Sequence, residues 1–285
     1  MIGRRPTEKG LVLIAVVFAL TAMTGLVLVL HAKMLSSMRT VDALAMSAKA
    51  FSCAQAGLEV AKALSWQDGP RSWPLQVSLV LGEARCSLEI SDEQGRFNLN
   101  TILGPDGAVD QQRLGQLKRL IGLAGIDDKG LADRIAAWLA RQRQAGKGKV
   151  SSMDEVLTMD VEDRQVLYRL LPYLTVHGDG LIDLNAAPAL VLQACLDDQD
   201  LAARIIAKRA SRPFGDVAEL RNLGLDEMAT SRLEGLFAVR SQAGWLRVRA
   251  AGQVGQVRRW ICAIIHANPS TGAADVISYW QQCVW

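Results

Sequence analysis

The chain has 285 residues, half of them hydrophobic, and carries a formal net charge of +3 at pH 7. This length is enough for one large domain or two smaller ones with well-packed cores. The positive side chains are spread along the sequence and form no basic tract, so the composition argues against a protein that binds nucleic acid through charge alone.

A short charged leader precedes a long apolar segment. Arg4, Arg5 and Lys9 stand just before Gly10, and residues 11–30 contain no charged side chain. About 20 helical residues, each rising about 1.5 Å, span a hydrocarbon layer of about 30 Å. We therefore predict a transmembrane helix over residues 11–30. The basic leader predicts a cytoplasmic N-terminus, and without a convincing signal-peptidase site we expect the segment to stay attached.

Helical periodicity continues beyond the membrane segment. Apolar residues recur at steps of three and four up to Leu64, and no proline interrupts them before Pro70. We predict one helix from the membrane to about Leu64, on the order of 80 Å long. Its first half would lie in lipid and its second half would offer an amphipathic face, so the helix would serve as both anchor and stalk.

Strand patterns lie on both sides of a long middle region. A turn at Gly82-Glu83 separates residues 77–81 from residues 86–91, in which apolar and polar side chains alternate. This pattern predicts a pair of half-buried strands. Further strands are predicted near the C-terminus, at residues 246–250, 260–265 and 276–280.

Residues 97–237, between the two strand regions, have helical periodicity. The strands before and after can pair while such a stretch stands off the sheet, so we predict an inserted helical domain. The stalk helix and first strands (residues 31–96) would form one discontinuous domain with the returning strands (residues 238–285). The predicted fold class is α+β, with a long N-terminal helix on a small antiparallel sheet and an all-α domain inserted between strands.

The helical region also repeats itself. The similar pairs are residues 97–101 (FNLNT) and 182–186 (IDLNA), residues 131–137 and 201–207, and the helix starts at residues 151–157 and 214–220. We predict two related units, residues 97–180 and 181–237. In the second unit, Asn185 is expected to cap a helix whose first turn takes Pro188.

The leader and the apolar helix resemble the signal of type IV prepilins, which a prepilin peptidase cuts after a glycine on the cytoplasmic side. Glycine suits such a site because it has no side chain to block access and permits an extended backbone. The resemblance implies cleavage between Gly10 and Leu11, followed by methylation of the new N-terminus. An uncut signal anchor is the alternative.

Ala15 would be the fifth residue of the mature chain. Most pilins and pseudopilins have glutamate at this position, where the carboxylate is thought to meet the N-terminal amine of a neighbouring subunit. A carboxylate inside the membrane is costly unless it is paired. A subunit with no neighbour above it would have no use for the acid, so Ala15 suits a subunit that caps a filament.

The order of the segments resembles that of the K-class minor pseudopilins of type II secretion. The likeness includes the leader, the long helix, the strand pair, EQGRFNLN (residues 93–100), LIDLNAAPALVLQA (residues 181–194) and the returning strands. It implies a single-pass inner-membrane protein with a periplasmic C-terminal domain. It also implies a complex with the I-class and J-class minor pseudopilins at the pseudopilus tip, which would initiate or cap the filament. Contacts with exported proteins and other secretion components are implied as well.

The second helical unit has a competing resemblance to the helix-hairpin-helix modules of DNA-binding proteins. Where those modules have a glycine-rich hairpin, this chain has Asp197-Asp198-Gln199-Asp200, whose carboxylates would repel phosphate. Residues 181–237 hold nine acidic and six basic side chains, a net of three negative charges. A membrane-anchored DNA receptor is therefore the less favoured hypothesis.

Several aspartates could supply oxygen ligands for calcium, which takes six to eight of them. The K-class resemblance implies calcium binding, but no ligand set can be matched residue by residue, and a solvated loop is the favoured interpretation. The candidates are Asp179, Asp183, Asp197, Asp198 and Asp200.

Catalysis and zinc binding find little support in the sequence. His31, His177 and His266 are far apart in the chain, and no hydrolase, metalloprotease or nucleotide-binding motif is present. No enzyme is predicted, and the tryptophans, among them Trp138, Trp245 and Trp260, are expected in the core. The cysteines lack zinc-site spacing; a disulfide is allowed in the periplasm, and its pairing is left open among Cys53, Cys86, Cys195, Cys262 and Cys283.

Overall fold

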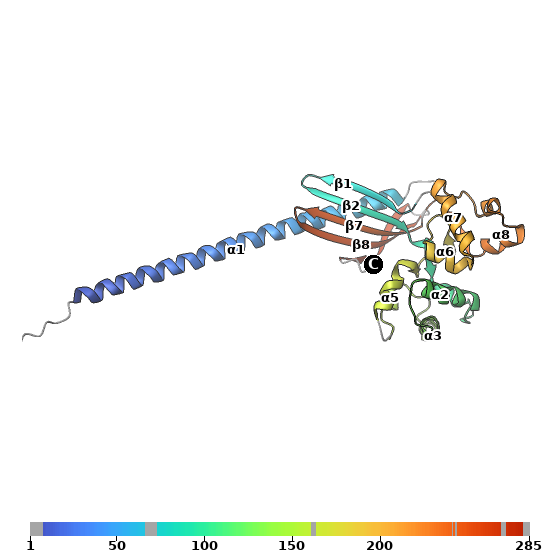
Figure 1. The fold of residues 1–285 in the computed structure, drawn as a ribbon, viewed down its shortest axis with the longest axis horizontal. Helices are drawn as coiled ribbons and strands as arrows, with labels where there is room; N and C mark the ends of the chain where they lie inside the picture. Colours follow the sequence, from blue (N-terminus) through green and yellow to red (C-terminus); the bar gives the residue numbers. More distant parts are fainter. Residues whose placement is uncertain are drawn as a thin grey trace, which may run out of the picture.

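A long helix leads into a compact head in the computed structural model (Figure 1). The structure describes residues 8–65, 73–160, 164–240, 242, 244–268 and 272–281. Helix α1 (Glu8–Ser65) has 58 residues and is about 90 Å long. Its outer half projects away from the head, and its last turns lie along the sheet, as the periodicity predicted.

The sheet has five antiparallel strands in the order β1-β2-β7-β8-β9. The strands are β1 (Leu75–Leu81), β2 (Ala84–Asp92), β7 (Trp245–Val254), β8 (Val257–Asn268) and β9 (Ala273–Trp280). Strand β2 pairs directly with β7, with Leu88 opposite Ala250 and Ile90 opposite Val248. Strands that are distant in sequence are therefore neighbours, and the region between them is an insertion. The predicted α+β class is confirmed.

Small residues let α1 approach the sheet closely. Ala50, Ala54 and Ala61 are fully buried on the helix face that meets β2, β7 and β8. A Cβ atom at Gly252 of β7 would lie 1.8 Å from the backbone oxygen of Ala50, which leaves room for glycine alone. The stalk is thus held to the head through backbone-to-backbone contact that larger side chains would prevent.

The insertion contains seven α-helices among the described residues, with 3-10 segments after α5 and between α7 and α8. They are α2 (Gln111–Leu123), α3 (Leu131–Gln144), α4 (Met153–Val156), α5 (Arg164–Leu170), α6 (Ala189–Leu196), α7 (Gln199–Ser211) and α8 (Glu227–Glu234). One cluster of buried side chains extends from Phe97 to Phe237. The two units predicted from the sequence would therefore share one hydrophobic core, which is separate from the core between α1 and the sheet.

Two short parallel strand pairs interrupt the helical insertion. Strand β3 (Phe97–Asn98) pairs with β4 (Leu174–Thr175), and β5 (Ile182–Asp183) pairs with β6 (Phe237–Ala238). In each pair the chain enters a group of helices by the first strand and leaves by the second. Pairs of two residues have too short a pattern to show in a periodicity analysis, which explains why a purely helical region was predicted.

The repeated sequence motif makes the same contacts in both units. The Asn100 side chain donates to the Val150 carbonyl (2.9 Å) and accepts from the Val150 amide (2.9 Å). The Asn185 side chain makes the same pair of bonds with Phe214, at 2.9 and 2.8 Å. The prediction that Asn185 caps α6 was wrong. Its buried side-chain amide is bonded to the backbone of Phe214, and Pro188 stands at the N-cap of α6.

Candidate functional site

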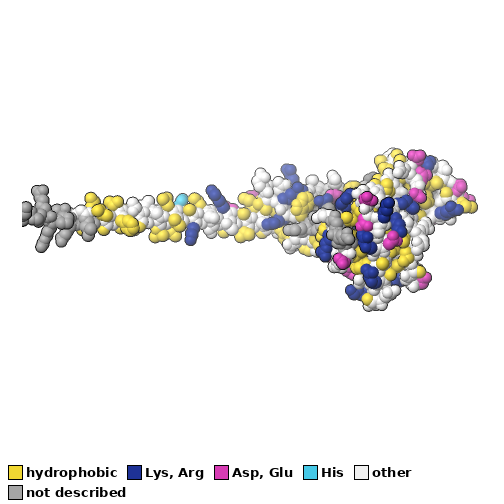
Figure 2. Space-filling model, turned by 60° about the horizontal axis from the view of Figure 1, so that its bottom comes forward, with side chains coloured by type: hydrophobic (Ala, Val, Ile, Leu, Met, Phe, Trp, Pro, Cys, Tyr) yellow, Lys and Arg dark blue, Asp and Glu magenta, His cyan; other side chains and the backbone are white. Residues whose placement is uncertain are grey.

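The outer half of α1 is a candidate membrane anchor. Among the described residues, one helix (Val12–Ser65) is long and apolar enough to cross a membrane. Its most apolar window is not buried against the head at all. Large side chains such as Ile14 and Phe18 are 69% and 74% exposed, and hydrophobic groups recur along the stalk in Figure 2, with Lys and Arg side chains, among those described, only toward the head. Such a surface needs lipid or neighbouring apolar helices around it.

The predicted processing site lies in the first turns of this helix. Gly10 and Ala15 are helical and exposed, and a Cβ atom at Gly10 would meet nothing within 4 Å. Cleavage between Gly10 and Leu11 stays a prediction. Since peptidases bind an extended backbone, the first helical turn would have to unwind for the bond after Gly10 to be cut.

The five calcium candidates lie in different local settings. Asp179 pairs with Arg240 (2.7 Å), and Asp183 is buried and accepts from the Asn185 amide (2.8 Å). Asp198 caps α7, whose first turn contains Asp200, and Asp197 ends α6. Among the described residues, no group of three or more His, Cys, Asp or Glu side chains is placed to hold a metal ion.

The turn between α6 and α7 lies where the nucleic-acid hypothesis expects a phosphate-binding hairpin. Asp197 adopts a left-handed conformation (φ 56°), which usually favours glycine. The carboxylate of Asp198 accepts from the Leu201 amide (2.9 Å), so it occupies the helix N-terminus where a phosphate would bind. The structure therefore gives the nucleic-acid hypothesis no support at this turn.

A buried ion pair joins the insertion to the sheet. Arg247 of β7 donates two bonds of 2.7 Å to the carboxylate of Glu93, which opens the insertion in η1 (Glu93–Gly95). Arg96 donates a third bond to Glu93 (3.1 Å), and Glu93 is fully buried. Burial alone would raise the pKa of Glu93, but the charges of Arg247 and Arg96 outweigh it and the pKa is lowered. Glu93 is thus an ionised clamp.

Two buried carboxyl groups meet at the same junction. Asp92, at the end of β2, and Asp183, in β5, are 2% and 1% exposed. Burial, followed by the charge of Asp183, raises the pKa of Asp92 well above its ordinary value, and burial also raises the pKa of Asp183. The nearby charge of Arg240 opposes both shifts. The pair therefore holds a proton more readily than isolated aspartates do.

The structure brings together two of the three histidines. His177 and His266 stack on Trp245, with ring centroids 4.5 and 4.2 Å from the indole. Burial lowers the pKa of His177, so the neutral ring is favoured in this stack. Trp245 is only half-buried, so the expectation of a core tryptophan was wrong there, whereas Trp138 is buried.

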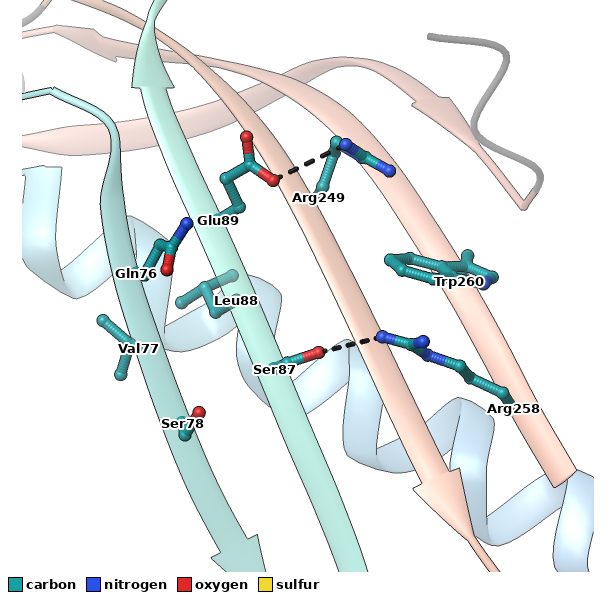
Figure 3. Close-up of a pocket in the computed structure, with 9 residues that line it drawn as sticks. All are labelled: Gln76, Val77, Ser78, Ser87, Leu88, Glu89, Arg249, Arg258 and Trp260. Atoms are coloured by element: carbon teal, nitrogen blue, oxygen red, sulfur yellow. Dashed lines mark hydrogen bonds and ion pairs between the residues drawn. The ribbon is translucent and has the colours of Figure 1, made fainter. Parts of the chain in front are cut away.

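A groove lies on the sheet face opposite α1 (Figure 3). Its volume is about 210 Å³, and it is lined by Gln76, Val77, Ser78, Ser87, Leu88, Glu89, Arg249, Arg258 and Trp260. The guanidinium carbons of Arg258 and Arg249 lie 4.1 and 5.5 Å from the ring centroid of Trp260. Trp260 was expected in the core, but it is half-buried and forms a wall of this groove.

The cysteines divide into bonded and free thiols. Cys262 is disulfide-bonded, and Cys53, Cys86 and Cys195 are buried and free; Cys283 is outside the described residues. Burial raises the pKa of Cys86 to about 11 and that of Cys195 to about 12. Both thiols therefore stay protonated near neutral pH, unlike the thiolates that act as nucleophiles.

Comparison with known proteins gives two matches that agree. The family model "Type II secretion system (T2SS), protein K" matches residues 182–248, which comprise the second helical unit and the start of β7. No curated protein matches the chain in sequence.

A solved structure with a similar fold is the GspK-GspI-GspJ complex from enterotoxigenic Escherichia coli Type 2 Secretion System. The match has 16% sequence identity and a TM-score of 0.58, and it covers 88% of this chain and 99% of the matched chain. The family resemblance expected from the sequence is thereby confirmed: residues 182–248 match type II secretion system protein K, on a chain with the pilin-like fold found in that complex.

Proposed function

We propose that the protein is a minor pseudopilin at the tip of the type II secretion pseudopilus, in a complex with the I-class and J-class minor pseudopilins. The observation that supports this most is the match of residues 182–248 to protein K, on a chain that has an exposed apolar stalk and a helical insertion beyond its sheet. The similar solved structure is itself a complex of GspK, GspI and GspJ.

The stalk explains how the subunit would enter a filament. The peptidase removes the leader after Gly10, and the apolar half of α1 stays in the inner membrane with the head in the periplasm. Within the filament, this half packs against the helices of neighbouring subunits, because its exposed side chains find no partner in the head. Ala15 offers no carboxylate for a further subunit's N-terminus.

The helical insertion explains why growth would stop at this subunit. It lies at the end of the sheet opposite the projecting stalk and extends sideways beyond it (Figure 1). The Glu93–Arg247 clamp holds the insertion to the sheet. A subunit added above would meet this bulk instead of a free helix and sheet surface, so the protein begins or caps a filament.

The test is the intact mass and N-terminal sequence of the membrane-extracted protein from cells with and without the prepilin peptidase. We expect a chain that begins at Leu11 when the peptidase is present and at Met1 when it is absent. A Gly10→Val variant should keep Met1 in both strains, because the added side chain blocks the scissile site. A wild-type chain that keeps Met1 in both strains would contradict entry into the pseudopilin pathway.

Partner assembly is tested separately by co-expression with the I-class and J-class subunits of the same bacterium. The expected result is a complex of the three subunits that survives detergent extraction and size-exclusion chromatography. Failure of the processed wild-type chain to associate with either subunit would overturn the tip assignment.

A further inference from the structure

The sheet has one face that α1 leaves open. Inward-facing residues such as Leu88, Val248 and Ile261 are buried against α1, while their neighbours in each strand face the opposite side. On that side β1, β2, β7 and β8 form the groove of Figure 3. Its walls carry polar and charged groups together with one large aromatic ring.

The groove has an excess of positive charge. Arg249 and Arg258 both lie against the ring of Trp260, and among the described lining residues Glu89 is the only carboxylate. Glu89 lies 3.5 Å from Arg249, which is at the limit of a hydrogen bond, and Arg258 has a 3.4 Å contact with the Ser87 hydroxyl. These long contacts leave both guanidinium groups able to bind a further acceptor.

Arg249 also has an unused donor. Its Nε atom is shielded from water and has no hydrogen-bond partner in the described part of the chain. A buried donor without an acceptor destabilises the folded protein. Once the Arg249 side chain turns toward the groove, a carboxylate could accept from this donor, and guanidinium groups bind carboxylates with charge-assisted bonds.

The position of the groove excludes a lipid phosphate. Trp260 pairs across the sheet with Ala251, whose neighbour Gly252 contacts α1 at Ala50. Ala50 is about 20 helical residues beyond Leu30, the end of the apolar segment, so the groove lies about 30 Å from the hydrocarbon layer. A neighbouring subunit packed along the stalk would reach this level, whereas a membrane headgroup would not.

We propose that this groove binds an acidic side chain of a neighbouring I-class or J-class pseudopilin. The inference rests on the proposed function and specifies the surface used. The two arginines bind the carboxylate, and the ring of Trp260 packs against the apolar part of the same side chain. Arginine and tryptophan are the residues that most often dominate binding energy when an interface buries them.

The experiment compares variants of the full-length chain co-expressed with the I-class and J-class subunits and purified in detergent. Arg258→Glu and the double variant Arg249→Glu/Arg258→Glu should reduce the amount of co-purified partner at least tenfold, because the new glutamate in the groove would repel the acidic side chain of the partner. Lys129→Glu is the matched control: it reverses an exposed charge on the insertion and should leave the yield unchanged. Arg258→Glu has the fewest internal contacts, so it keeps the test valid if the double variant misfolds.

A photo-reactive phenylalanine at Ser78, which is exposed in the groove, identifies the occupant directly. A crosslink to the I-class or J-class subunit, lost in Arg258→Glu, is the expected result. If wild type forms the complex but Arg258→Glu does so equally and Ser78 gives no crosslink to either subunit, the groove assignment fails and the proposed function stands. A crosslink only to a second copy of this chain or to nucleic acid also overturns it. If wild type forms no complex at all, the proposed function itself fails.

Discussion

Replacing Glu93 by glutamine tests whether an ionised clamp holds the insertion to the sheet. Glu93 is fully buried, and the Arg247 side chain that binds it at 2.7 Å is 5% exposed. Glutamine keeps the shape but removes the charge between the buried guanidinium groups of Arg96 and Arg247. Removing one partner of a buried ion pair costs about 3–5 kcal/mol. At about 2–4 °C per kcal/mol for a domain of this size, the melting temperature should fall by about 6–20 °C.

Two further variants, one of them a control, are compared with Glu93→Gln by their loss of stability. Arg247→Met should cost less than Glu93→Gln, because Glu93 keeps its bond to the cationic Arg96. The carbonyls of Leu171 and Leu174 lose a donor in this variant, which is a smaller effect than leaving two cations without their carboxylate. Arg249→Met is the matched control on the same face of β7; its partner lies 3.5 Å away at a half-exposed site, so the loss should be below about 1 kcal/mol.

The assay measures thermal unfolding of the full chain in detergent, with tryptophan fluorescence as the signal, and is repeated over a series of pH values. Because the pKa of Glu93 is lowered in the folded state, its contribution is present above its ordinary pKa and is lost as the pH falls through the folded value. The difference between wild type and Glu93→Gln should therefore shrink in acid. A shift below 2 °C at pH 7 or a larger effect of Arg247→Met would refute the reasoning.

Four other substitutions, at three positions, probe separate features by the same assay. Gly252→Ala should destabilise the protein by about 1–3 kcal/mol, because a Cβ atom would collide with α1 at Ala50; an unchanged melting temperature would contradict the close packing of stalk and sheet. Asp197→Gly should be neutral or stabilise by up to about 1 kcal/mol, whereas Asp197→Ala should destabilise, because the left-handed backbone disfavours a Cβ atom; the reverse order would show that the aspartate side chain matters more than the backbone. Asp183→Asn should raise the melting temperature more at pH 8 than at pH 5. The raised pKa values of Asp183 and Asp92 mean that their contribution is complete below the unfolded pKa and is lost as pH rises through the folded values; an effect independent of pH would argue against the protonated pair.

Periodicity predicted the elements whose burial follows a regular pattern. The long helix, the first strand pair and the returning strands were placed within a few residues. The strands and the last turns of α1 bury one face in a regular pattern, and the outer part of α1 is an uninterrupted apolar run. Asn185 was correctly singled out as part of a repeated motif, but its role was mistaken. Its partner Phe214 is 29 positions away, and no local rule predicts a side-chain bond over that separation.

The charged groups of the junction escaped the sequence analysis for the same reason. Arg247 alternates with apolar residues in β7 and so resembled a solvent-facing residue, yet it is buried against Glu93, 154 positions earlier. The acidic pair, the histidine–tryptophan stack and the groove around Trp260 likewise combine residues from distant strands and loops. Sequence separation hides such groups until the sheet brings them together.

The sequence by itself determined the elements that follow from local patterns of apolar and polar residues. These are an apolar stretch long enough for a membrane, a stalk helix, alternating strands and two copies of a helical motif. These follow from the intrinsic geometry of helices and strands, which each short segment expresses on its own. Only the tertiary structure decided which charges are buried, which thiols are free and which face of the sheet stays open. Those properties depend on contacts between strands β2, β7 and β8 and the insertion, whose residues lie far apart in the chain.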